Sequence, residues 1–115
     1  MATIEECRSA LERLSENLAG AEGDLHSAAA LDRSLSCRIT DLDVTFVGRL
    51  VDGRIQDVVT VQGLPAERAE IRLTMAGDDL VALVDGRLHF AKAWGGGRVK
   101  LEAGFRDLLR LRKLL

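Results

Sequence analysis

The chain has 115 residues, 47% of them hydrophobic and 30% charged, with a formal net charge of −2. This length predicts a single domain over residues 1–115, large enough to bury roughly two thirds of its unfolded surface. The acidic balance, with one Trp, three Phe and no Tyr, excludes the basic, aromatic-rich surface of nucleic-acid-binding proteins, so we expect no nucleic-acid partner. No segment approaches the ~18 apolar residues of a membrane span, and the first residues lack the pattern of a secretion signal. We therefore expect a cytoplasmic protein.

The N-terminal segment has the pattern of an amphipathic helix. Thr3 and Glu6 have the spacing of a capping box, which marks a helix start. Apolar residues then recur every three or four positions: Ile4, Cys7, Leu11, Leu14, Leu18, Ala21 and Leu25. This stripe fits either a helix docked on its own sheet or a dimerisation seam. We favour docking because the heptad pattern is short and Gly20 and Gly23 interrupt its end, so we expect a monomer or a weak homodimer.

A short helix or an irregular turn is expected over 24–32, and three strands are expected over 34–40, 44–51 and 54–61. Asp52-Gly53, between the second and third strands, is typical of a type I′ hairpin because both residues accept positive φ. These two strands should therefore pair antiparallel.

Two later segments, 69–75 and 99–103, alternate apolar and polar residues with the period of a half-buried strand. Between them lie two short helices, the first with Asp78 and Asp79 in its first turn, Gly77 as its N-cap and Gly86 near its C-cap. A closing helix of leucines and bases follows. The runs of strands predict an α+β fold, a five-stranded mostly antiparallel sheet with helices packed on one face.

Histidine and cysteine do not form a recognisable metal or nucleophile motif. His26 and His89 lack the spacing to a second ligand that a metal site requires. Cys7 and Cys37 fall on apolar sides of their elements, which is typical of buried thiols rather than of thiolates or a disulfide framework. We therefore expect no metal and no cofactor.

Two further motifs suggest catalysis only weakly. The glycines at 95–97 lack the Lys-Ser/Thr of a phosphate loop and precede a strand, so we interpret them as a connection. Asp57 is the one acid expected to point inward from a strand, and the chain has no Tyr to pair with it in an isomerase-like site. We therefore expect no enzyme.

The order of these elements resembles the sterol carrier protein type 2 family. The resemblance covers residues 71–74, 78–86, 88–94, 97–101 and 108–115, including Asp-Asp-Leu-Val-Ala-Leu-Val-Asp-Gly, an aromatic stretch and Gly-Arg-Val-Lys-Leu. It implies a hydrophobic tunnel between sheet and helices in which a fatty acid, acyl-CoA, sterol or similar apolar lipid is bound and transferred without catalysis.

The lining of such a tunnel would combine the inward rows of the strands with the apolar sides of the helices. These ligand-binding candidates are Phe46, Leu73, Leu80, Leu83, Val84, Leu88, Phe90, Trp94, Leu101, Phe105, Leu108 and Leu109. The same residue types would line a filled core, so the alternative is an interaction or regulatory module of the same fold, possibly homodimeric. The bases at 106, 110, 112 and 113 fit either transient contact with anionic lipid head groups or a solvated helix face.

Overall fold

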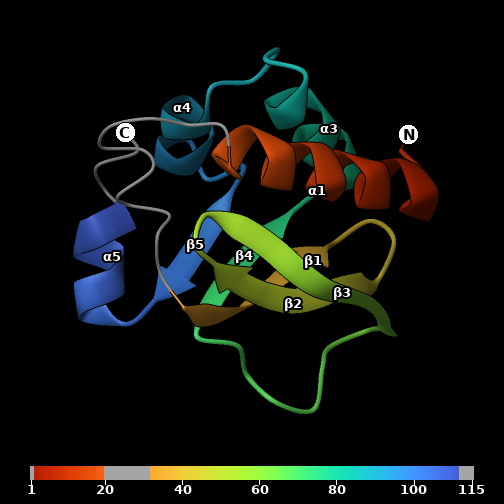
Figure 1. Cartoon of the computed structure of the whole chain (residues 1–115). Helices are drawn as coiled ribbons and strands as arrows, with labels where there is room; N and C mark the ends of the chain where they lie inside the picture. Colours follow the sequence, from red (N-terminus) through yellow and green to blue (C-terminus); the bar gives the residue numbers. More distant parts are fainter. Residues whose placement is uncertain (1, 20–31, 112–115) are drawn as a thin grey trace.

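The computed structural model describes residues 2–19 and 32–111, and its elements form one sheet with a layer of helices on it (Figure 1). In chain order they are α1 (Ile4–Ala19), β1 (Arg33–Ile39), β2 (Val44–Val51), β3 (Arg54–Gln62), β4 (Ile71–Met75), α3 (Gly77–Val84), α4 (Phe90–Gly95), β5 (Lys100–Ala103) and α5 (Phe105–Leu111). The strand bounds agree with those expected from the sequence to within two residues. The short helix or turn expected over 24–32 lies, apart from its last residue, outside the described residues.

The five strands form one sheet in the order β3-β2-β1-β4-β5. β1 and β4 run parallel, and the other neighbouring strands run antiparallel. Helices α1, α3 and α4 lie on one side of this sheet, and α5 follows the edge strand β5 (Figure 1). The predicted α+β fold with a mostly antiparallel sheet is therefore confirmed.

Local sequence signals set the ends of several elements as expected. The backbone N–H of Thr3 donates to Glu6 Oε1 and the N–H of Glu6 donates to Thr3 Oγ1, each at 3.1 Å, which is the predicted capping box. Asp52 and Gly53 have φ of 51° and 78°, as a type I′ turn requires. These contacts fix the start of α1 and the β2–β3 register.

The apolar stripe of α1 lies closer to an ideal helix than to the heptad pattern. Cys7, Ala10 and Leu11 are buried, whereas Ile4 is 41% exposed. A period of 3.6 residues places Ala10 beside Cys7 and Leu11, so the expectation that Ile4 faces inward is wrong. The buried side of α1 packs on α3 and β3, which confirms docking on its own fold.

Two other local expectations are corrected. The N-cap of α3 is Ala76, and Gly77 is the first helical residue, whose N–H donates to Asp41 Oδ1 at 2.9 Å. Asp57 is exposed and has φ of 56°, at the place where the β2–β3 register shifts between Val47 and Arg49. A β-bulge there turns this carboxylate outward.

Candidate functional site

One face of the sheet is apolar across neighbouring strands. The register places Cys37 opposite Phe46 and Leu73 opposite Leu101. Cys37 also pairs with Leu73 across the parallel β1–β4 contact. Because residues in register share a face, these four side chains point to the same side of the sheet, the side that the helices cover.

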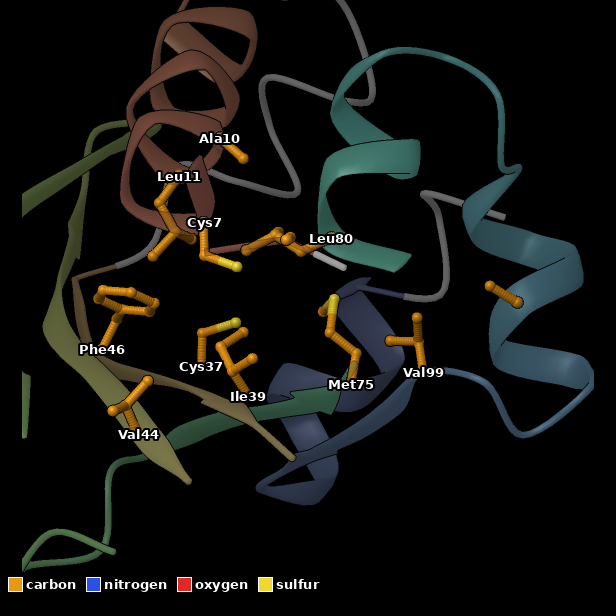
Figure 2. Packing of buried hydrophobic residues seen from close by; sticks show 12 residues of the cluster. Cys7, Ala10, Leu11, Cys37, Ile39, Val44, Phe46, Met75, Leu80 and Val99 are labelled. Atoms are coloured by element: carbon orange, nitrogen blue, oxygen red, sulfur yellow. The ribbon is translucent and has the colours of Figure 1, made fainter. Parts of the chain in front are cut away.

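The helix layer closes over one end of this face to form a buried cluster. Figure 2 shows Leu11 pointing from α1 toward Phe46, Cys7 pointing from α1 toward Cys37, and Leu80 pointing into the same region from α3. Its fully buried members are Ala2, Cys7, Ala10, Leu11, Cys37, Ile39, Val44, Phe46, Met75, Leu80, Ala93 and Val99. The part of the face beneath α1, α3 and α4 is therefore a packed core.

A second buried cluster lies farther along the same face and consists of Leu35, Leu50 and Ile71. Leu73 and Ile55 are partly buried and pack against both clusters. The two clusters are therefore joined into one apolar surface that runs from the helix layer toward the ends of β1 and β4.

Large side chains that are only partly buried border this surface. Leu83, Val84, Leu88 and Phe90 pack against the first cluster without being sealed by it. The Phe90 and Trp94 rings have centroids 5.7 Å apart and an interplanar angle of 54°. These two aromatic residues therefore share a face, and α3 and α4 together form an apolar rim.

The twelve predicted lining residues fall into three groups by exposure. Phe46 and Leu80 are fully buried, and Phe105 and Leu109 are 76% and 47% exposed. The remaining members are partly buried: Leu73, Leu83, Val84, Leu88, Phe90, Trp94, Leu101 and Leu108. The structure thus brings most of them together around the apolar surface, whereas α5 presents Phe105 and Leu109 largely to solvent.

Sequence reasoning missed the contribution of β3. Ile55 and Val58 both pack against the first cluster, although they are three positions apart and a regular strand would place them on opposite faces. The bulge at Asp57 resets the alternation. A positive φ at a non-glycine strand residue has no strong sequence signal. The alternation of apolar and polar residues therefore did not show that both side chains contact the apolar cluster.

Burial determines the chemistry of the two thiols beneath the helix layer. It raises the pKa of Cys7 to about 11, with a smaller contribution from the Asp41 carboxylate, and raises the pKa of Cys37 to about 12. Both residues are free and buried, as expected. As neutral thiols they add to the apolar character of the layer and are poor nucleophiles.

Acids at the start of α3 make structural contacts. The Ala2 N–H donates to Asp78 Oδ1 at 2.6 Å, and Asp79 forms an ion pair with Arg98. Their position in the first turn also suits the helix dipole. This agrees with the interpretation of the two acids as elements of the helix start.

No family model and no curated protein matches the sequence. Solved structures do match across nearly the whole chain, and they include sterol carrier protein 2, with 19% identity and a TM-score of 0.63 over 97% of this chain and 86% of that one. Palmitated SCP2L2 from Aedes aegypti matches at 15% identity and a TM-score of 0.57, over 97% of this chain and 92% of that one.

A third match lies within a larger enzyme. The sec-alkyl sulfatase PisA1, in a double-mutant structure, has 20% identity and a TM-score of 0.61 over 99% of this chain but only 16% of the sulfatase. The arrangement of helices and sheet is thus that of a small α+β domain. More particularly, the chain has the sterol carrier protein 2 fold, as the sequence resemblance implied.

Features that concern a membrane are few in the described part of the chain. Within residues 2–19 and 32–111, none of the helices is both long and apolar enough to cross a bilayer. Of the four bases considered for contact with lipid head groups, Arg106 is exposed. Residues 112 and 113 lie outside the described residues, so the membrane-contact hypothesis stays a prediction.

Proposed function

We propose that this protein binds and carries an apolar lipid, such as a long-chain fatty acid, an acyl-CoA or a sterol, in a tunnel between the sheet and helices α3 and α4. The protein performs no catalysis in this proposal. One observation carries it: a continuous apolar face of the sheet, joined through Leu73, is bordered by a rim of partly buried apolar side chains.

The energetics of such a surface favour an acyl chain. Each methylene removed from water contributes about 0.8 kcal/mol. Ten methylenes covered by Leu73, Leu83, Val84 and their neighbours would contribute about 8 kcal/mol before the cost of association. Hydrogen-bonding groups are not needed for this term, so the aliphatic composition of the rim is sufficient.

Proteins of the same fold support the proposal. The name of sterol carrier protein 2 includes a sterol, and SCP2L2 from Aedes aegypti is described as palmitated. The matched region of the alkyl sulfatase, in contrast, is a small part of an enzyme. With both thiols held neutral by burial, we infer binding and transport rather than chemistry as the role of this chain.

Native mass spectrometry of the purified protein, combined with lipid extraction, tests the proposal directly. We expect a retained lipid mass on a monomer or a weak dimer. Added fatty acid at a hundred times its dissociation constant should stabilise the fold by about 2.7 kcal/mol and raise Tm by roughly 10 °C or more. The absence of both a retained lipid and a thermal shift, across fatty acids, acyl-CoA and sterols, would instead favour the filled-core interaction module.

A further inference from the structure

The face of the sheet that points away from α1, α3 and α4 has a hollow of its own. It has a volume of about 310 Å³ and lies between the loop after β3 and strands β1, β2 and β4 (Figure 1, green loop). Ser36, Thr45 and Thr74 contribute hydroxyls to its wall, and Arg38 and Arg72 contribute guanidinium groups. Leu73 also lines the hollow, but side chains alternate between the two faces of a strand, so the hollow and the proposed lipid site lie on opposite faces of the sheet.

The two arginines are neighbours because of the parallel β1–β4 register. Ser36 pairs with Arg72, and Arg38 pairs with Thr74. Arg38 and Arg72 are therefore diagonal neighbours on one face, within reach of each other's long side chains. Both arginines thus rise from neighbouring strands on one face, beside hydroxyl groups.

Among the described residues, each guanidinium makes one hydrogen bond and retains a buried donor that makes none. Arg38 Nη2 donates to Asp43 Oδ1 at 2.9 Å, and Arg72 Nη1 donates to the Ala69 carbonyl at 2.7 Å. Arg38 Nη1 and Arg72 Nε are buried, and neither has a hydrogen-bond partner within the described ranges of the chain. Buried charged donors without an acceptor are unfavourable, so an acceptor that reaches them from the hollow would be stabilised there.

We propose that the hollow binds a small oxyanion, a phosphate or carboxylate group, between Arg38 and Arg72. The planar guanidinium presents paired N–H groups that match the two oxygens of such an anion. The lining carries one net positive charge, since Arg38, Arg68 and Arg72 outnumber Glu67 and Glu102. A volume equal to the share of about ten water molecules suits a free anion or a small organic acid.

The Glu102 carboxylate competes with a bound anion for Arg72. Its Oε2 lies 3.9 Å from Arg72 Nη2, close enough for an ion pair but too far for a hydrogen bond. The edge formed by Nε and Nη2 of Arg72 therefore makes no hydrogen bond with Glu102, and a bidentate anion that reaches this edge from the hollow would use both donors. The Glu102 carboxylate opposes that anion by its charge, so its neutralisation should strengthen binding.

Nuclear magnetic resonance of the unmodified protein tests the proposal without any risk of misfolding. Inorganic phosphate and succinate are titrated separately at constant ionic strength against chloride, and the arginine Nε–H signals are followed. We expect saturable shifts of the Arg72 Nε–H and of the Ser36 and Thr74 amides. Arg49 Nε, already paired with Asp32 at 2.7 Å, serves as the internal control and should not move. The tighter of the two anions shows whether phosphate or carboxylate is the preferred group.

Matched variants then assign the binding. Arg38→Gln and Arg72→Gln should each weaken binding by about tenfold or more, since each removes a charge-assisted bond. Arg49→Gln lies on the same face outside the hollow and should bind as the parent does, and Glu102→Gln should bind more tightly. Three results would each overturn the proposal. The first is signal shifts no larger than those with chloride, the second is a loss of anion affinity in Arg49→Gln equal to that in the Arg38 and Arg72 variants, and the third is weaker anion binding in Glu102→Gln. Circular dichroism checks the folding of each variant. If a variant fails to fold, the titration of the unmodified protein alone decides whether the anion binds.

Discussion

Replacement of Gly77 with Ala tests how tightly α3 docks on α1. A Cβ at this position would lie 2.9 Å from Cys7 Sγ and 3.4 Å from both Ala2 Cβ and Ile39 Cγ2. Cys7 and Ile39 are fully buried, so neither side chain can swing into solvent to make room. Overpacking of this kind costs about 1–3 kcal/mol. The higher helix propensity of Ala offsets up to about 1 kcal/mol of that cost.

We therefore expect Gly77→Ala to lower the free energy of unfolding by about 1–2 kcal/mol, and to lower Tm by about 5–10 °C for a domain of this size. Thermal unfolding followed by circular dichroism measures the change. Cys7→Ala removes the sulfur that the new methyl group would meet, and itself costs about 1 kcal/mol as a buried large-to-small substitution.

The double variant supplies the decisive comparison. If the clash is with Cys7 Sγ, the Gly77→Ala, Cys7→Ala protein should be more stable than the sum of the two single effects predicts, because residues in contact couple. A parent-like Tm for Gly77→Ala, or strictly additive effects, would refute the reasoning. Gly77 would then be a helix start that tolerates any small residue.

Three further outcomes are expected. Because burial raises the thiol pKa values of Cys7 to about 11 and Cys37 to about 12, the folded state keeps protons that unfolded thiols release above about pH 8.5. Stability should therefore fall as pH rises from there through both folded pKa values, and fast reaction of the native protein with a thiol reagent near neutral pH would contradict the burial. Trp94 emission should change saturably on lipid titration. Trp94→Phe should abolish that signal while retaining the lipid affinity measured by mass spectrometry. An emission that no lipid alters would show that the indole does not line the site. Leu83→Arg should weaken lipid binding by about tenfold or more with the fold intact, since the rim would gain an unpaired charge, and Leu64→Arg, at a position 72% exposed, should bind as the parent does; equal binding by both variants would remove Leu83 from the lining.

The sequence predicted the fold best where local chemistry and periodicity agreed. The alternation of Ile71, Leu73 and Met75 and the positive φ of Asp52-Gly53 needed no tertiary information, and both were correct. The error at Gly77 has a tertiary cause, because Asp41, from the β1–β2 turn, supplies the acceptor for the first helical N–H. A helix start that is capped from elsewhere in the chain leaves no signal at the usual positions.

The sequence predicted the candidate lipid site only as separate rows of apolar residues, one on each strand or helix. Strand alternation identified the apolar face, but helix periodicity on the short α5 did not separate Leu108 from the exposed Phe105 and Leu109. The bulge at Asp57 hid the contribution of Ile55. The hollow on the opposite face was not predictable, because Arg38 and Arg72 come together only through the β1–β4 register, which no local pattern specifies.

The β1–β4 register positions both the proposed lipid site and the proposed oxyanion site, although the two sites bind different chemical groups. Arg72 and Leu73 are sequence neighbours on β4, yet one points into the polar hollow and the other joins the two apolar clusters. A slip of one residue between β1 and β4 would exchange their faces, placing a guanidinium in the apolar layer and a leucine beside Arg38. The pairing of Ser36 with Arg72 and of Cys37 with Leu73 therefore positions both sites at once. Substitutions at Arg72 should affect oxyanion binding and those at Leu73 lipid binding, provided that the β1–β4 pairing is retained.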